Sequence, residues 1–197
     1  MKRIYILIGL LAVSVTALVS YIYPATMKIL EWDALFLNTK SFFLLKLSQG
    51  AGLNGWFTDF LLQYFRWPLM AGIINAVLLA LLCLFCSLFL RKMKPDGVVS
   101  EVGMIPALMF LLLFPFQINL IIEGIFFFAG LWAYKLLQKY SQRLLFCIVF
   151  VPVGFLLMSV PVLVLLYIIL SLIEFFWTKK PLHALPHILC IVVVLSM

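Results

Sequence analysis

Long apolar blocks separated by short polar segments form the main pattern of the sequence. A helix needs about 20 apolar residues to cross the roughly 30 Å hydrocarbon core of a bilayer. Residues 4–23 form one uncharged block of that length, and residues 67–90 form another that ends at Arg91-Lys92. The first block follows Lys2-Arg3, as a secretory signal would, but it has no small-residue cleavage site, so an uncleaved anchor is expected.

The second half of the chain predicts two helical hairpins and a partial helix. Pro115 and the polar turn Gln117-Ile118-Asn119 divide one apolar stretch, and Ser159-Val160-Pro161 divides the next. The final apolar run reaches only about 15 Å as a helix, so the chain is expected to be the front part of a longer protein. The predicted spans after residue 90 are 102–116, 120–134, 144–159, 161–177 and a partial 188–197.

Composition supports this interpretation. Hydrophobic residues make up 66% of the 197 residues and charged residues 11%, whereas soluble domains are near half apolar and a quarter charged. A soluble enzyme, a disordered chain and a disulfide-stapled secreted domain are therefore excluded. The expected fold is all-α, a single polytopic transmembrane bundle over 1–197 with six spans, a partial seventh and amphipathic interfacial helices in the first outer loop.

The net charge of +7 predicts topology rather than nucleic-acid binding, because the basic residues form no stripe. With the N-terminus in the cytoplasm, the inner segments 1–3, 91–101, 135–143 and 178–187 hold ten Lys and Arg residues, and the longer outer loop 24–66 holds four. This distribution satisfies the positive-inside rule. We therefore expect a multi-pass protein of the cytoplasmic (inner) membrane.

The outer loop 24–66 carries most of the sequence outside the spans. Pro24 is expected to end the first helix, and Asn38 and Thr39 to cap a short helix over 41–47. Residues 48–55 are expected to form a glycine-rich turn. Residues 56–66 place aromatic side chains on one helical face and polar ones on the other, which is typical of a helix lying along the membrane surface or of one that stiffens entry into the next span.

Glu31 and Asp33 are the carboxylates nearest to the end of the first span. Residues two apart point in different directions in a strand or a helix, so only an irregular loop would aim both at one ligand. There they could bind a divalent metal ion or act as a base. The alternative is that they only keep the loop soluble.

A few polar groups fall within or beside the predicted spans. Glu123 either faces a cavity inside the membrane or sits in the first helical turn at the interface. Glu174 is expected to extend to the inner surface beside Lys179 and Lys180. His183 and His187 have ligand spacing but no evident third ligand, and the four cysteines are expected to be buried and free.

The arrangement of a short inner N-terminus, a span, an outer loop with an acidic pair and a return span resembles the start of the C-type integral-membrane glycosyltransferases. Glu31-Trp32-Asp33 matches the E-x-D form of that superfamily's motif in its first outer loop. The resemblance implies a sugar donor linked to polyprenyl phosphate, and a divalent metal held by Glu31 and Asp33. The superfamily core has about seven spans, so the chain matches its N-terminal part.

Residues 31–80 also look like an uncharacterised family of multi-pass proteins from Bacteroidetes. The matching segments are Leu35-Phe36-Leu37, Gly52-Leu53, Phe57-Thr58-Asp59-Phe60-Leu61-Leu62-Gln63-Tyr64-Phe65 and Trp67-Pro68-Leu69-Met70-Ala71-Gly72. They cover about a quarter of the chain, and the family has no settled activity.

The leading hypothesis is therefore a glycosyltransferase-like protein, or its N-terminal core, acting at the outer face of the membrane. Glu31 and Asp33 would be the catalytic base or metal ligands, and the substrate-binding residues would be Lys40, Lys46, Arg66 and Glu123. The partners would be membrane lipid and a polyprenyl-phosphate-linked sugar. The first alternative is a non-catalytic scaffold or assembly subunit with membrane-protein partners, and a transporter is less favoured because the hairpins show no internal repeat.

Overall fold

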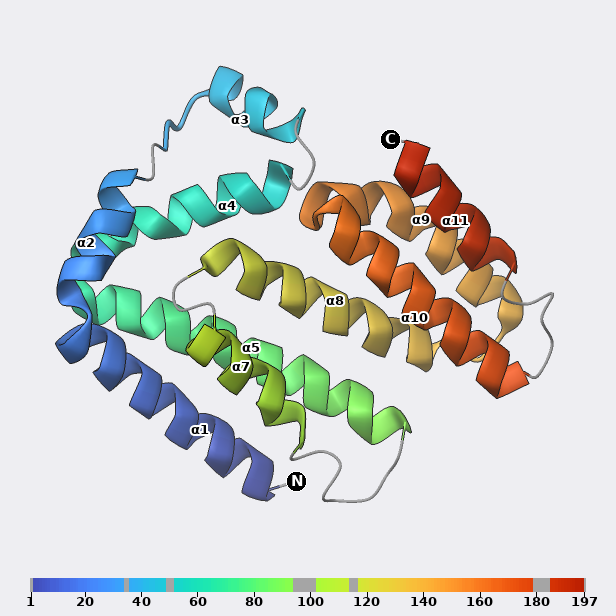
Figure 1. The fold of residues 1–197 in the computed structure, drawn as a ribbon, viewed down its shortest axis with the longest axis horizontal. Coiled ribbons are helices and arrows are strands. Elements are labelled where there is room, and N and C mark those ends of the chain that lie inside the picture. Colours follow the sequence, from blue (N-terminus) through green and yellow to red (C-terminus); the bar gives the residue numbers. More distant parts are fainter. Residues whose placement is uncertain are drawn as a thin grey trace.

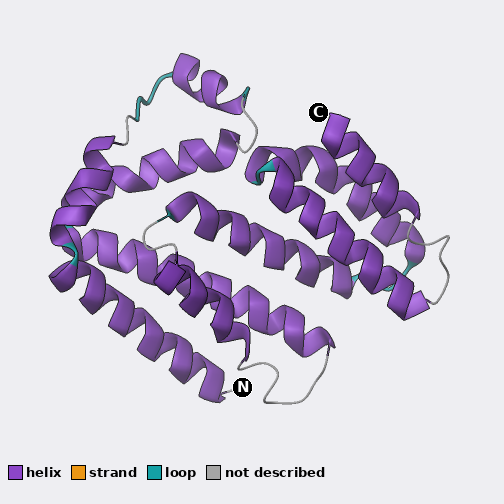
Figure 2. Cartoon of the chain, in the orientation of Figure 1, coloured by secondary structure: helices purple, strands orange, loops and turns teal. Residues whose placement is uncertain are grey.

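The computed structural model describes residues 2–33, 36–48, 52–93, 102–113, 117–178 and 185–196. Within these ranges every regular element is helical, as Figure 2 shows. The fold is therefore all-α, as the hydrophobic blocks predict. The α-helices are α1 (Lys2–Ala17), α2 (Pro24–Asp33), α3 (Lys40–Leu47), α4 (Gly52–Leu62), α5 (Pro68–Met93), α7 (Ile105–Leu113), α8 (Ile118–Leu136), α9 (Tyr140–Leu157), α10 (Val160–Thr178) and α11 (Leu185–Ser196).

Three short turns of other helix types complete the described elements. A π-helical turn, Leu18–Ile22, continues α1, and a 3₁₀ turn, Gln63–Arg66, joins α4 to α5. A second 3₁₀ turn, Val102–Met104, precedes α7. The predicted break at Pro24 is present, because Tyr23 leaves the helical conformation and Pro24 starts α2, where its missing N–H costs no bond.

The long helices pack around two apolar clusters, and the neighbouring helices α5, α8 and α10 run in the same direction (Figure 1). One cluster is built mainly by α1, α5 and the first half of α8, and the other by the second half of α8 with α9, α10 and α11. Because α8 contributes to both clusters, it joins the two parts of the bundle.

The helix ends lie at two opposite edges of the bundle (Figure 1). We call one the loop end: it holds α2, α3, α4, the start of α8 and the turn between α9 and α10. We call the other the Arg143 end: it holds the start of α1, the last turn of α5 and the connection between α8 and α9. The segments predicted to be cytoplasmic thus lie at the same edge wherever they are described.

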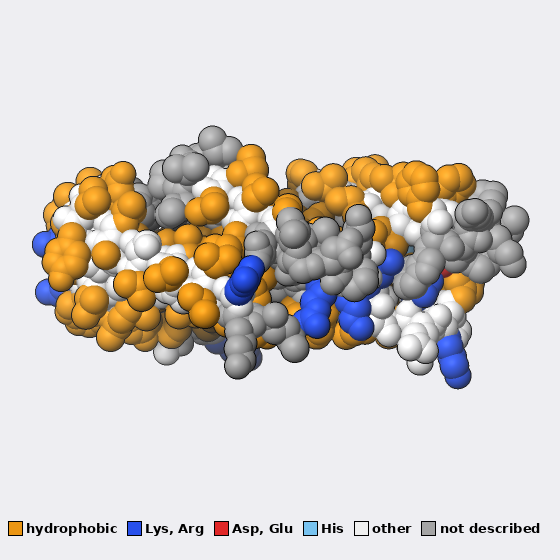
Figure 3. Space-filling model, turned by 90° about the horizontal axis from the view of Figure 1, so that it is seen from below, with side chains coloured by type: hydrophobic (Ala, Val, Ile, Leu, Met, Phe, Trp, Pro, Cys, Tyr) orange, Lys and Arg blue, Asp and Glu red, His pale blue; other side chains and the backbone are white. Residues whose placement is uncertain are grey.

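The outer surface of the bundle is mostly apolar. Figure 3 shows hydrophobic side chains over most of the visible described face, with Lys and Arg confined to a few places. Among the described residues, α1 with its π-helical turn, α5, α8 and α9 are long and apolar enough to cross a membrane, and Val160–Phe176 of α10 and Leu185–Ser196 of α11 are shorter apolar segments. Such a surface is stable only in lipid, so the chain is an integral membrane protein with several candidate spans.

Glycine allows α1 and α5 to approach closely. A Cβ atom on Gly72 would lie 2.6 Å from Ser20 Oγ and 2.8 Å from the carbonyl oxygen of Thr16. Ser20 also donates a hydrogen bond of 3.2 Å to the Pro68 carbonyl. Small residues at a helix crossing bring backbones together in this way in membranes.

The outer loop differs from its prediction in two places. Residues 52–55, expected to be part of a turn, form the first turn of α4, and the helix expected to reach Arg66 changes to 3₁₀ geometry at Gln63. A Cβ on Gly52 would overlap the Lys46 carbonyl oxygen, so only glycine allows α4 to begin against α3. The predicted short helix and its cap are present, with Thr39 Oγ1 accepting from the N–H of Phe42 at 3.3 Å.

Candidate functional site

The acidic pair of the outer loop lies on α2. Glu31 is half-buried near the C-terminal end of that helix, and Asp33 is its last residue, with a side chain outside the described part. Residues two apart in a helix are about 200° apart around its axis. The backbone here is therefore regular, not the irregular loop that would bring both carboxylates to one ligand, and their role as base or metal ligands stays a prediction.

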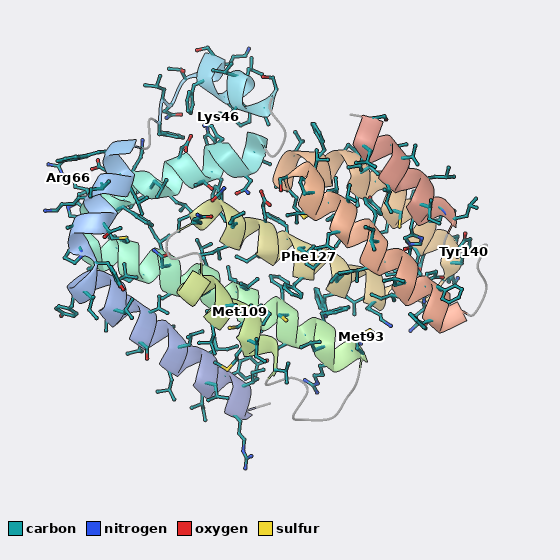
Figure 4. The ribbon with its side chains drawn as sticks, viewed as in Figure 1. Lys46, Arg66, Met93, Met109, Phe127 and Tyr140 are labelled. Carbon is teal, nitrogen blue, oxygen red and sulfur yellow. The ribbon has the colours of Figure 1, made fainter. Side chains whose placement is uncertain are left out.

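The cations proposed to bind substrate have different surroundings. Lys46 Nζ lies 2.7 Å from Asp59 Oδ2, in an ion pair that joins α3 to α4. Lys40 is exposed at the start of α3. Arg66 is exposed at the end of the 3₁₀ turn, which packs against α2, so it is the predicted cation brought closest to the helix of Glu31 (Figure 4).

The aromatic face of α4 packs against Phe36 and Phe43 of the same outer loop, residues 24–66. Trp56 lies 5.4 Å from both Phe36 and Phe43, and Phe60 lies 5.6 Å from Phe36, measured between ring centroids. These contacts partly cover Trp56 and Phe60, whereas Phe57 and Tyr64 on the same predicted face are 41% and 38% exposed. The opposite face, with Asn54 and Thr58, is buried against the bundle.

A first polar cluster, the Glu123 cluster, joins α4, α8 and the α9–α10 turn at the loop end. Glu123 is 4% exposed, and Ser159 Oγ donates a hydrogen bond of 2.8 Å to its carboxylate. One turn earlier on α8, the Asn119 carbonyl accepts a hydrogen bond of 3.0 Å from Asn54 Nδ2, and Thr58 contacts Asn54 Oδ1 at 3.3 Å. Glu123 is thus buried where it fastens the α9–α10 turn to α8, and its predicted role in lining a cavity stays a prediction.

A second polar cluster, the Arg143 cluster, was not predicted. Arg143 Nη1 lies 3.2 and 3.0 Å from the two carboxylate oxygens of Glu174, and the Arg143 Nε–H donates to the Leu137 carbonyl at 2.9 Å. Glu174 is fully buried and Arg143 is 7% exposed. The prediction that Glu174 extends to the surface is therefore wrong, because the hairpin supplies a cation inside the bundle.

Tyr134 extends the Arg143 cluster to a fourth helix. Its hydroxyl donates a hydrogen bond of 2.9 Å to Glu174 Oε2, and His187 Nε2 lies 2.9 Å from the same hydroxyl oxygen. A phenol has one proton, so with that proton on the carboxylate side Nε2–H of His187 is the donor to the hydroxyl. The cluster thereby links α8, α9, α10 and α11 through charge-assisted hydrogen bonds.

The sequence contains a signal for the Arg143–Glu174 pair. The turn between α9 and α10 is centred near Ser159, and Arg143 lies 16 residues before Ser159 and Glu174 15 residues after it. In an antiparallel hairpin, residues at equal distances from the turn lie at the same height. Two opposite charges in that register on apolar helices predict a buried pair.

No group of three or more His, Cys, Asp or Glu residues comes together as a metal site within the described ranges. His183 lies outside these ranges, and His187 contacts Tyr134. Cys83, Cys86, Cys147 and Cys190 are buried and free, as predicted.

The comparison with protein families gives a match over the whole chain. A family model described as a family of unknown function, DUF6057, matches residues 1–197. The chain belongs to the DUF6057 family. No curated protein and no solved structure matches this DUF6057 chain. Family membership thus agrees with a resemblance to uncharacterised proteins and assigns no activity.

Two grooves open sideways on the DUF6057 bundle, and both are mainly apolar. One, of about 520 Å³, lies between α1 and α5, with Thr16, Ser20 and Tyr21 among its otherwise apolar lining residues. The other, of about 460 Å³, lies between α9 and α11 and is lined by aliphatic, proline and cysteine side chains. Neither groove is lined by Glu123, Arg143, Glu174 or Tyr134.

Proposed function

We propose that this DUF6057 chain is a non-catalytic membrane subunit that assembles with other membrane proteins. The observation that supports this proposal is the use of the buried charges. Glu123 binds the Ser159 hydroxyl, and Glu174 binds Arg143 and Tyr134. A charge inside a membrane bundle is costly, and here that cost is offset by bonds that fix helix positions rather than by a site open to substrate.

The regular geometry of α2 supports the same proposal. An enzyme that used Glu31 and Asp33 together would need both carboxylates directed to one point, and a helical segment does not bring residues two apart together. In our proposal the chain spans the cytoplasmic membrane several times with its N-terminus in the cytoplasm. The loop end then faces the exterior.

A native gel of the chain and of a variant without the two acids tests whether the chain assembles independently of Glu31 and Asp33. We expect the full chain, extracted from its native membrane in a mild detergent, to migrate on a native gel in a discrete complex much heavier than its 22.5 kDa. The double variant Glu31→Gln/Asp33→Asn should leave that complex unchanged. Migration as a single chain of 22.5 kDa in every mild detergent would contradict the proposal.

A second candidate, the N-terminal core of a C-type-like glycosyltransferase, is favoured by one contact. The 3₁₀ turn that carries Arg66 packs against α2, which carries Glu31 and Asp33. Arg66 would bind the phosphate of a polyprenyl-linked donor, while the two acids would act as base or divalent-metal ligands. Lys46 is less suited to bind this phosphate because it is paired with Asp59. Lys40 is exposed at the start of α3.

Sugar transfer from a polyprenyl-phosphate donor in native membranes tests this candidate. If Asp33→Asn abolished transfer while the chain still inserted into the membrane, the glycosyltransferase proposal would replace that of a subunit. Transfer at the unaltered rate would reject a role for Asp33.

A further inference from the structure

The groove between α1 and α5 has the dimensions of one lipid chain. Its lining residues run from Ala12 to Tyr21 on α1 and from Leu69 to Ala80 on α5. At 1.5 Å per residue these segments are about 14 and 17 Å long. Half of a 30 Å hydrocarbon core is about 15 Å. The groove therefore extends through one leaflet, from the loop end to the middle of the bilayer, and a transmembrane helix would need about twice that length.

Small side chains create this groove, and its polar groups are already bonded. Ala12, Ala17, Ala76 and Ala80 lie along its walls. Thr16 Oγ1 donates to the Ala12 carbonyl at 2.9 Å, and Ser20 Oγ donates to the Pro68 carbonyl. Hydroxyls bonded to the backbone do not require a polar ligand, so the wall suits a hydrocarbon chain.

The mouth of the groove has the features of a membrane–water interface. The π-helical turn Leu18–Ile22 leaves Tyr21 85% exposed, and Trp67, two residues before the lining residue Leu69, is 56% exposed. Tyr and Trp favour the level of lipid headgroups, and π-helical turns are frequent at functional sites.

Arg66 supplies a charge beside this mouth. It precedes the groove residue Leu69 by three positions, so their Cα atoms are at most about 11 Å apart, and its side chain is exposed. A guanidinium binds phosphate oxygens in a bidentate manner. Arg66 is thus an exposed cation that the chain places near the groove residue Leu69.

We propose that the α1–α5 groove binds one chain of a membrane phospholipid in the leaflet at the loop end, with Arg66 holding the headgroup phosphate. The proposal depends on neither function proposed above. The bound lipid would fill the space beside the Gly72 crossing and fix the separation of α1 and α5 at this end.

Native mass spectrometry of the full chain in detergent with added phosphatidylglycerol tests the groove. Val77→Phe and Ala17→Phe fill the groove from opposite walls, and each should lower the bound lipid at least about tenfold, or about 1.4 kcal/mol. The matched control is Val149→Phe, because Val77 and Val149 are 52% and 55% exposed and only Val77 lines this groove. Lipid binding by both filled variants at the level of the control would overturn the proposal.

Arg66→Gln tests the headgroup contact. We expect it to weaken phosphatidylglycerol binding about tenfold, Arg66→Lys to weaken it less, and the exposed control Arg91→Gln to have no effect. Excess inorganic phosphate should not displace the lipid, because the hydrocarbon chain contributes to binding. Displacement by phosphate alone, or unaltered lipid binding by the Arg66→Gln variant, would overturn the assignment.

Conversion of a dimer to a monomer by Val77→Phe would show instead that a second copy occupies the groove.

Discussion

Replacing Arg143 with Gln removes the guanidinium that contacts both carboxylate oxygens of Glu174. The guanidinium lies 3.2 and 3.0 Å from those oxygens, and the carboxylate is fully buried. Removing one partner of a buried ion pair typically costs about 3–5 kcal/mol, because the other charge stays buried without compensation. We expect a loss of unfolding free energy in that range for Arg143→Gln.

The double variant Arg143→Met/Glu174→Leu tests whether the loss of stability comes from leaving the Glu174 charge buried without Arg143. Replacing both partners with apolar residues of similar size is often neutral, so this variant should be more stable than Arg143→Gln. Tyr134 limits the recovery, since it loses the acceptor of its 2.9 Å hydrogen bond.

The assay is reversible unfolding of the detergent-solubilised chain by sodium dodecyl sulfate, followed by circular dichroism. Arg91→Gln, at an exposed position in the last turn of α5, is the control and should change the unfolding free energy by less than about 0.5 kcal/mol. A cost for Arg143→Gln no larger than the control's would refute the reasoning that this pair holds the C-terminal hairpin together.

Further substitutions test single contacts with the same assay. Gly72→Ala should destabilise the chain by about 1–3 kcal/mol because its Cβ meets the backbone of α1, whereas Gly55→Ala meets nothing within 4 Å and should be neutral or stabilising. Tyr134→Phe should cost about 1–3 kcal/mol, since it removes the hydroxyl shared by two buried partners. Lys46→Ala should cost at most about 1 kcal/mol, because its ion pair with Asp59 is partly exposed.

The long helices could be predicted closely because lipid requires long uninterrupted apolar segments. The predicted span 67–90 corresponds to the observed helix Pro68–Met93, and the predicted span 161–177 corresponds to Val160–Thr178. In the predicted span 102–116, Val102–Met104 form a 3₁₀ turn, α7 begins at Ile105, and residues 114–116 lie outside the described part. Residues 52–55 are predicted as a turn because glycine disfavours helix, whereas the structure has the first turn of α4 there.

The site could be predicted only in part. The sequence indicates Glu123 as a candidate site residue, but it gives Ser159 only as a turn residue and not as the partner of Glu123. Arg143 was counted as a loop cation and Glu174 as a surface acid, since each was compared with its sequence neighbours. Their contact joins residues 31 positions apart. The sequence predicts it only if Arg143 and Glu174 are aligned by their equal distances from the hairpin turn.

The most direct test of the membrane-spanning bundle is the sidedness of its two ends. In intact cells stripped of their outer layers, a membrane-impermeant maleimide should label Asn38→Cys and Gln63→Cys, both exposed at the loop end. Lys92→Cys and Lys139→Cys, both exposed at the Arg143 end, should be labelled only after the membrane is opened. Labelling of all four positions from the same side would contradict the account.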